Sequence, residues 1–169
     1  MEDSIDIVIT WVNGSDPVWL AEKEKYTSSG DRKKSDVAGD ARYQDNGLFR
    51  FVFRGIEKFA PWVRRVHLVT YGHLPAWLDT NCKKLAIVYH RDFMNAAYLP
   101  TFSSVPLNLN LFRIPDLSER FIYFNDDMFI TAPITEKYYF VNELPRDQFI
   151  FNSVSAKNGN NIYINNMVI

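Results

Sequence analysis

Four short apolar runs, separated by polar or amphipathic stretches, dominate the first 130 residues of the chain. The first, Ile5–Val12, is rich in β-branched residues, and similar runs follow at Arg65–Tyr71, Lys84–His90 and Arg120–Phe124. Continuous apolar runs of this length are typical of strands covered on both faces, as in a parallel sheet.

Helical patterns lie between these runs. Asp16, followed by a proline, predicts the N-cap of a helix over residues 17–26. Over residues 47–59 apolar residues recur at helical spacing, and Asp45 or Asn46 is predicted to cap that helix. Strand alternating with helix predicts an α/β fold with a mainly parallel sheet flanked by helices.

The remaining segments carry weaker patterns. Residues 75–81 predict a short helix, and residues 103–114 predict a helix capped by serine, with a strand as the alternative. The charged stretch 22–41 predicts a flexible surface loop, with a lid as the less favoured reading. Short β-like pieces after residue 136 predict a small C-terminal antiparallel edge. We expect one domain over residues 1–169.

Each predicted strand ends in polar residues. The sequences after the four runs are NGSDP, YGH, HRD and NDD. Because the carboxyl ends of parallel strands meet at one edge of a sheet, where ligands of α/β folds bind, we expect one shared site there.

The NDD sequence supplies two carboxylates and an amide oxygen directly after a strand. Asp126 and Asp127, with Asn125, suit a hard divalent cation such as Mg²⁺ or Mn²⁺ that bridges to substrate phosphates. The alternative is that both carboxylates cap the next turn and point into water.

The loop Asn13–Asp16 precedes a predicted helix N-terminus, where backbone N–H groups receive phosphate or ribose hydroxyl groups. An ordinary turn with a helix cap explains the same residues. Neither a glycine-rich dinucleotide fingerprint nor a P-loop is present.

A basic stretch surrounds the start of the second helix. Arg50 and Arg54 share one helix face and suit a diphosphate clamp, and Arg42 and Asp45 lie just before them. The alternatives are a solvated face with pairs such as Arg54 with Glu57, and an Asp45 that only caps the helix.

Composition narrows the function classes. The net charge of −1 does not favour a nucleic-acid binder, and a single cysteine excludes an internal disulfide framework. The N-terminus fits neither a signal peptide nor a membrane span, so we expect a cytoplasmic protein, with membrane-peripheral association as an alternative. His67 is expected to be a sheet residue, whereas His73 and His90, at strand ends, are candidates for substrate contact. The oligomeric state stays open.

Several long segments together resemble the Stealth family. They are IDIVITWVNGSDP, RYQDNGLFRFVFRGIEKFAPWVRRVHLVTYGHLPAWL, LPTFSS and IPDLSERFIYFNDDMF, which follow one another from about residue 5 to 130. The family includes bacterial capsular polysaccharide phosphotransferases and the animal N-acetylglucosamine-1-phosphotransferase. The resemblance implies transfer of a sugar 1-phosphate from a UDP-sugar to a glycan hydroxyl, with Mg²⁺ and release of UMP.

Site residues follow from the resemblance. It implies that Asp45 is an essential catalytic carboxylate near the reacting phosphate, that Arg54 is a second catalytic residue that contacts phosphate or sugar, and that Asp126 and Asp127 hold the metal. The substrate contacts it implies are Asn13, Gly14, Ser15, Asp16, Arg42, Asn46 and Asn125.

The chain departs from the family pattern at two places. Asn108 and Phe112 stand where relatives carry an acidic residue and a histidine, and the sequence ends where a third signature region is expected. An ordinary metal-dependent glycosyltransferase and a catalytically incomplete sugar-nucleotide-binding domain are therefore the alternative hypotheses.

Overall fold

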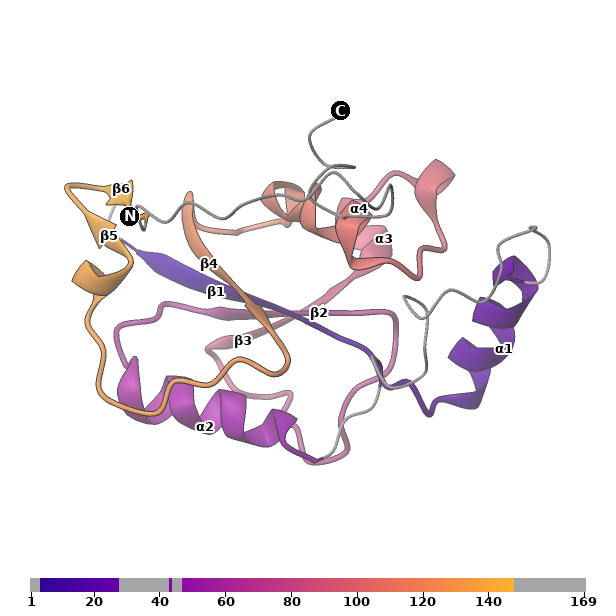
Figure 1. Cartoon of the computed structure of the whole chain (residues 1–169), viewed down its shortest axis with the longest axis horizontal. Helices are drawn as coiled ribbons and strands as arrows, with labels where there is room; N and C mark the ends of the chain where they lie inside the picture. The colour runs from indigo at the N-terminus through magenta and orange to yellow at the C-terminus, as the bar shows by residue number, and fades with distance from the viewer. Residues whose placement is uncertain (1–3, 28–42, 44–46, 148–169) are drawn as a thin grey trace, which may run out of the picture.

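The computed structural model describes residues 4–27, 43 and 47–147. Their centre is a four-stranded sheet in the order β3-β2-β1-β4, with every neighbouring pair parallel. The strands are β1 (Ile5–Trp11), β2 (Val66–Thr70), β3 (Leu85–Tyr89) and β4 (Arg120–Asn125). Figure 1 shows this sheet. The sheet confirms the four predicted strands and the α/β class.

The strand order reverses beside β1. The chain places β2 and then β3 on one side of β1, whereas β4 returns to the other side. Ile7 consequently pairs with Val66 on one side and with Ile122 on the other. In open α/β sheets the crevice at such a reversal is where ligands bind, which directs attention to the carboxyl ends of β1 and β4.

Helices cover both faces of the sheet, as Figure 1 shows. Helix α2 (Phe49–Phe59) lies on one face, and the short helices α3 (His90–Phe93) and α4 (Ser104–Asn108) lie on the other. Helix α1 (Pro17–Thr27) follows β1 and stands beyond the carboxyl end of the sheet.

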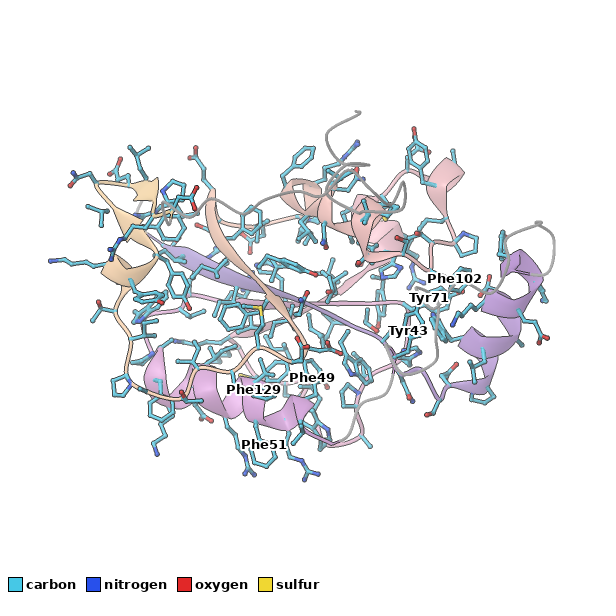
Figure 2. The ribbon with its side chains drawn as sticks, viewed as in Figure 1. Tyr43, Phe49, Phe51, Tyr71, Phe102 and Phe129 are labelled. Carbon is cyan, nitrogen blue, oxygen red and sulfur yellow. The ribbon has the colours of Figure 1, made fainter. Side chains whose placement is uncertain are left out.

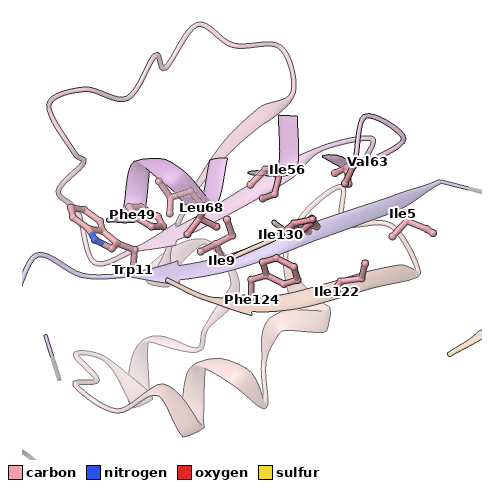
Figure 3. Packing of buried hydrophobic residues seen from close by; sticks show 14 residues of the cluster. Ile5, Ile9, Trp11, Phe49, Ile56, Val63, Leu68, Ile122, Phe124 and Ile130 are labelled. Atoms are coloured by element: carbon pink, nitrogen blue, oxygen red, sulfur yellow. The ribbon is translucent and has the colours of Figure 1, made fainter. Parts of the chain in front are cut away.

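Alternate residues of the strands fill two hydrophobic cores. Ile5, Ile7 and Ile9 pack on the α2 side. Figure 3 shows Ile5 and Ile9 with Phe49 and Ile56. Val8, whose side chain points to the opposite face of the sheet, packs in the second core beneath α3 and α4. Both faces of β1 are therefore buried, which explains its continuous β-branched sequence.

Helix α2 packs very closely on the segment that follows β4. A Cβ atom at Gly55 would lie 2.6 Å from the carbonyl oxygen of Ile130. Glycine is therefore the residue that allows the two backbones to meet, which places residues 129–131 along the flank of α2. The N–H of Ile134 donates to the carbonyl of Phe59 at the far end of that contact.

The predicted starts and ends of some helices were wrong. The N-cap position of α2 is Leu48, which has no side-chain cap, rather than Asp45 or Asn46. Gly47 adopts a positive φ of 74° just before it, so the chain turns sharply into the helix. Residues 22–27 are helical rather than part of a loop, and residues 28–41 lie outside the described residues.

The helix predicted over residues 75–81 is a pair of turns. The side chain of Asp79 accepts a hydrogen bond from the N–H of Asn81, which offers the backbone an alternative to the helix. The segment 103–114 does start with a serine cap, since Ser103 accepts from the N–H of Val105, but it divides into α4 and a 3₁₀ turn at Leu111–Arg113.

A small antiparallel pair follows the main sheet. Strands β5 (Phe140–Val141) and β6 (Leu144–Pro145) form a two-stranded sheet of their own, which confirms the small antiparallel element predicted near the C-terminus. Within the described ranges, every helix is too short or too polar to cross a bilayer.

Candidate functional site at the carboxyl edge of the sheet

The loop after β1 is held by its own side chains. The Asn13 carboxamide oxygen accepts from the N–H of Ser15 at 3.0 Å, and the N–H of Asp16 donates to the Asn13 carbonyl at 3.0 Å. A carboxylate oxygen of Asp16 accepts from the N–H of Trp19 at 2.8 Å, which confirms the predicted N-cap of α1. The N-terminus of α1 is therefore fixed beside the end of β1.

Gly14 brings a distant part of the chain onto this loop. Its N–H donates to the carbonyl of Tyr43 at 3.0 Å, and a Cβ at Gly14 would lie 2.3 Å from Tyr43 atoms. Any larger side chain would push the two segments apart. The tyrosine hydroxyl in turn donates to the carbonyl of Phe102 at 3.2 Å, so three segments meet here.

His73 connects the end of β2 to the same loop. The N–H of Asn13 donates to His73 Nε2 at 2.6 Å, so Nε2 is an unprotonated acceptor in this arrangement. Nδ1 lies 4.0 Å from the Asp16 carboxylate. Burial lowers the pKa of His73, and the nearby negative charge of Asp16 only partly opposes that effect. The imidazole is thus held neutral.

The end of β4 lies next to β1. Asn125 pairs with Thr10 in the sheet, one residue before β1 ends. Asp126 and Asp127 occupy the following turn, which the N–H of Met128 closes on the Asn125 carbonyl at 3.2 Å. Asp126 is half-buried and Asp127 is exposed, so at least the second carboxylate is open to ligands from solvent.

The donor set at this turn fits Mg²⁺. The described residues contain no cluster of three or more acidic, histidine or cysteine side chains suited to a metal. Mg²⁺, however, commonly uses only one or two carboxylates and takes its other ligands from waters and substrate phosphates. Asp126 and Asp127 provide that number at the carboxyl ends of β1 and β4, where the strand order reverses; this position is called the β1–β4 crevice below.

An aromatic cluster borders the loop on the β2–β3 side, and Figure 2 labels three of its members, Tyr43, Tyr71 and Phe102. Tyr71 stacks on Phe102 with ring centroids 6.0 Å apart and meets the ring of His90 edge-on at 5.9 Å. Its hydroxyl donates to the carboxylate of Glu22 on α1. An open cavity of about 280 Å³ lies here, lined in part by Tyr71, His90 and Arg91.

Lys23 is buried within this cluster rather than solvated. Its side chain is 9% exposed, and the ammonium group lies 4.2 Å from the ring centroid of Tyr43 and 5.1 Å from that of Trp19. Cation–π contacts of this kind stabilise a desolvated ammonium group. The positive charge is therefore fixed on the side of α1 that faces Tyr43, which itself contacts the loop after β1.

Lowering the pH from 7 to 4 is expected to destabilise the fold through His90. Burial lowers the pKa of His90 from 6.5 to about 4, with a smaller contribution from His73. Since the folded-state pKa lies below the unfolded one, the unfolded chain binds the proton first, and stability falls as the pH drops from 6.5 towards 4. Each tenfold change in proton affinity is worth about 1.4 kcal/mol, so the full effect is roughly 3 kcal/mol.

Urea denaturation of wild type and His90→Gln at pH 7, 6, 5 and 4 measures this effect. The variant should lose roughly 2–3 kcal/mol less stability over that range than the wild type. Identical pH profiles for the two proteins would show that His90 does not titrate in this window.

The structure brings some of the predicted site residues together and separates others. Asn13, Gly14, Ser15 and Asp16 form one loop, and Asn125, Asp126 and Asp127 follow the neighbouring strand. Arg42, Asp45 and Asn46 lie outside the described residues, so their roles stay predictions.

The two arginines of α2 do not face the sheet. Arg50 donates from Nε to the carbonyl of Gly47, and Arg54 lines a groove with residues of the segment after Asp127. Neither arginine pairs with Glu57 among the ion pairs of the described residues. Their place is thus beside the site rather than within the β1–β4 crevice.

Two residues of the site, Tyr43 and Lys23, were not identified from sequence, and the partner of a third was not. His73 was a general candidate for substrate contact, but its bond to Asn13 depends on a partner 60 residues away. Tyr43 and Lys23 carried no usable signal, because a lysine in a charged run resembles any solvated lysine. The one sequence feature that pointed to this part of the site was the position of His73 just after a predicted strand.

Comparison with known proteins places the chain in a family. The model for Stealth protein CR2, conserved region 2, matches residues 42–147, and the model for Stealth protein CR1, conserved region 1, matches residues 3–31. The chain is 51% identical over 146 residues to the capsular polysaccharide phosphotransferase WcwK of Streptococcus pneumoniae, which covers 86% of this chain and 44% of that protein.

Two further relatives carry similar descriptions. The receptor polysaccharide phosphotransferase WefC of Streptococcus oralis is 47% identical over 145 residues, covering 85% of this chain and 44% of that protein. The capsular polysaccharide phosphotransferase CpsJ of Streptococcus thermophilus is 38% identical over 166 residues, covering 98% of this chain and 70% of that protein. The chain thus spans less than half the length of the first two relatives. The two matched regions together establish that the chain belongs to the Stealth family.

Proposed function

We propose that this chain binds the sugar-nucleotide donor in a phosphotransferase that moves a sugar 1-phosphate from a UDP-sugar to a hydroxyl group of a capsular or exopolysaccharide glycan. The relatives named above are polysaccharide phosphotransferases, which supports the reaction class and the glycan acceptor. The single observation that carries the proposal is the convergence of the Asn13–Asp16 loop and the Asn125–Asp127 turn at the β1–β4 crevice.

In the proposed complex the donor diphosphate lies between these two segments. The N-terminus of α1, capped by Asp16, carries the positive end of the helix dipole and favours phosphate nearby. Asn13 and Gly14 are held by His73 and Tyr43 respectively, so the loop is ordered before the donor arrives. An ordered loop binds with a smaller entropic cost than a mobile one.

Asp126 and Asp127 would hold Mg²⁺, which neutralises charge on the diphosphate and withdraws electrons from it. Asn125 stands beside them as a hydrogen-bonding group for the donor or for a metal-bound water. This assignment is supported by the number and kind of oxygen ligands at the turn and by its place at the strand reversal.

The proposed transfer exchanges one P–O bond for another. An acceptor hydroxyl oxygen bonds to the sugar-proximal phosphorus, and the bond from that phosphorus to the bridging oxygen breaks, so that UMP leaves with the bonding electron pair. A carboxylate is suited to take the hydroxyl proton, and Asp45 is the residue for which we propose this role. We propose that Arg42 contacts a phosphoryl oxygen of the donor. The corresponding role of Arg54 stays a prediction from the family resemblance, because its side chain lines the groove beside α2. A cytoplasmic location remains a prediction.

The nucleotide product tests the proposal. The protein is incubated with UDP-N-acetylglucosamine, Mg²⁺ and oligosaccharides released from streptococcal capsule, and the nucleotides are separated by chromatography. UMP with a new phosphodiester in the glycan is expected. Release of UDP would instead identify an ordinary glycosyltransferase, and donor binding without either product would identify a binding domain.

A further inference from the structure

An open groove of about 350 Å³ runs beside α2, outside the β1–β4 crevice. One wall is the α2 face formed by Phe51, Arg54, Gly55, Lys58 and Phe59, and the other is the segment Phe129–Thr131. Phe129 comes two residues after Asp127, and the tight contact of Gly55 with Ile130 forms the floor. The groove therefore starts next to the proposed metal-binding turn and leads away from it along the helix.

The groove combines exposed aromatic rings with positive charge. Phe51 and Phe129 are 45% and 41% exposed, and Figure 2 shows Phe51 on the side of α2 away from the sheet. The Arg54 guanidinium lies 5.5 Å from the ring centroid of Phe51, and the Lys58 ammonium lies 5.1 Å from that of Phe59. Large apolar side chains left in water beside fixed charges are typical of a binding surface.

The two cations of the groove have no carboxylate partner in the part of the chain that the structure describes. Among those residues no acidic side chain lines the groove, and no ion pair involves Arg54 or Lys58. The two residues stand one helical turn apart on the same face, so both cations reach a single anionic group lying along the helix. The expected occupant is therefore anionic and has apolar faces for the phenylalanines.

We propose that this groove binds the acceptor glycan through a phosphodiester that the glycan already carries. This inference rests on the proposed function, because a polymer extended by sugar 1-phosphate transfer contains phosphodiester links from earlier rounds. The C–H faces of sugar rings pack on Phe51 and Phe129, and Arg54 and Lys58 contact the phosphodiester oxygens. The neighbouring hydroxyl of the chain then extends towards the turn that holds Asp126 and Asp127.

A membrane surface is the competing occupant and fits the groove less well. A helix that lies on a bilayer presents a broad apolar face to it. In α2 that face is used by the core, since Phe49, Val52 and Ile56 are buried against the sheet. Within α2, Phe51 is the one apolar side chain that is exposed, and it stands beside the cation Arg54, which suits a narrow ligand such as a glycan.

Calorimetry with three probes tests the groove. The first is a trimer of N-acetylglucosamine units joined by 1-phosphodiester bonds, the second is the same trimer joined by glycosidic bonds, and the third is vesicles of phosphatidylglycerol. The wild-type chain should bind the phosphodiester trimer at least about tenfold more tightly than the neutral trimer, because charge-assisted hydrogen bonds form only with the first. Vesicles should not bind.

Two variants locate the binding. Lys58→Glu and Phe51→Ala alter exposed side chains and should each weaken binding of the phosphodiester trimer by about tenfold or more. Affinity for UDP-N-acetylglucosamine should stay within about twofold of the wild type, because neither residue lies in the crevice. The matched control is Lys83→Glu, the same charge change at an exposed position outside the groove.

The outcomes separate this inference from the proposed function. Donor binding without any preference for the phosphodiester trimer would overturn the groove assignment alone. Vesicle binding that Lys58→Glu removes would overturn it in favour of a membrane surface. Selective trimer binding by a chain that fails to bind the donor would support the groove and contradict the proposed donor site.

Discussion

Replacing Asp6 with alanine is expected to lower the free energy of unfolding by about 3–5 kcal/mol, the usual effect of removing one partner from a buried ion pair. Asp6 is fully buried on β1, on the sheet face opposite α2. The substitution leaves the buried His67 and the charged Arg64 without the carboxylate to which both are bonded.

The geometry explains why this carboxylate matters more than a surface one. Arg64 donates from Nε to one oxygen of Asp6 at 2.9 Å and from Nη2 to the other at 2.5 Å. The second oxygen also lies 3.0 Å from His67 Nε2 and accepts from the N–H of Ser118 at 2.9 Å. One side chain thus connects β1, the start of β2 and the turn before β4.

The pH dependence of the free energy of unfolding gives an independent measurement of the contribution of Asp6. Burial alone raises the pKa of Asp6, but the hydrogen bonds from His67, Arg64 and the Ser118 backbone outweigh it and hold the pKa well below its ordinary value of 3.8. Because the folded-state pKa is the lower one, this stabilisation is present above pH 3.8 and is lost as the pH falls through the folded-state pKa. The free energy of unfolding of Asp6→Ala should therefore decrease less than that of the wild type as the pH falls below 3.8.

Urea denaturation at pH 7 and in the acid range measures both effects. Asp116→Asn is the matched control, since that carboxylate also contacts Arg64 but is 63% exposed, and asparagine tolerates the positive φ of 58° at this position. Its cost should stay below about 1 kcal/mol. A comparably small cost for Asp6→Ala would mean that Arg64 and His67 find other partners when the carboxylate is removed.

The Asp6 network also shows what local sequence patterns do not contain. The four strands were predictable because each is a short run of mainly apolar, β-branched or aromatic residues, which is a property of consecutive positions. His67 was correctly expected to be a sheet residue, but its partner is 61 positions away and nothing near either residue indicates the pairing. Contacts of this kind arise from strand order, which residue patterns alone do not specify.

The same distinction applies to the candidate site. The edge of the sheet was predictable because polar residues follow every apolar run, and parallel strands end together. The groove was not, because it depends on the approach of Gly55 to Ile130, 75 positions apart, and Arg54 lines the groove that this contact forms. A helical face with two arginines looks the same in sequence whether it faces the site or flanks it.

Asp126→Asn and Asp127→Asn are each expected to weaken Mg²⁺-dependent binding of UDP-N-acetylglucosamine by about 100-fold, equivalent to about 3 kcal/mol. Asparagine preserves the size and the hydrogen-bonding oxygen of the side chain, so the turn closed by Met128 should persist. What is removed is the negative charge that a hard divalent cation requires from its ligands.

The two positions need not respond equally. Asp127 is exposed and Asp126 is half-buried with contacts inside the protein, so the Asp126 variant should also show a change in thermal stability. Asp79→Asn is the matched control, because Asp79 is likewise an exposed aspartate in a turn, outside the β1–β4 crevice. Its donor binding should equal that of the wild type.

Binding of Mn²⁺, followed by its electron paramagnetic resonance signal, separates loss of the metal from loss of the donor. If the acid pair holds the cation, both variants should bind Mn²⁺ more weakly, with or without the UDP-sugar, whereas the control should not. Donor binding that is equally strong in the variants and in the wild type, and independent of added Mg²⁺, would contradict the assignment of these carboxylates. They would then be turn residues facing water, and another part of the protein would have to neutralise the diphosphate.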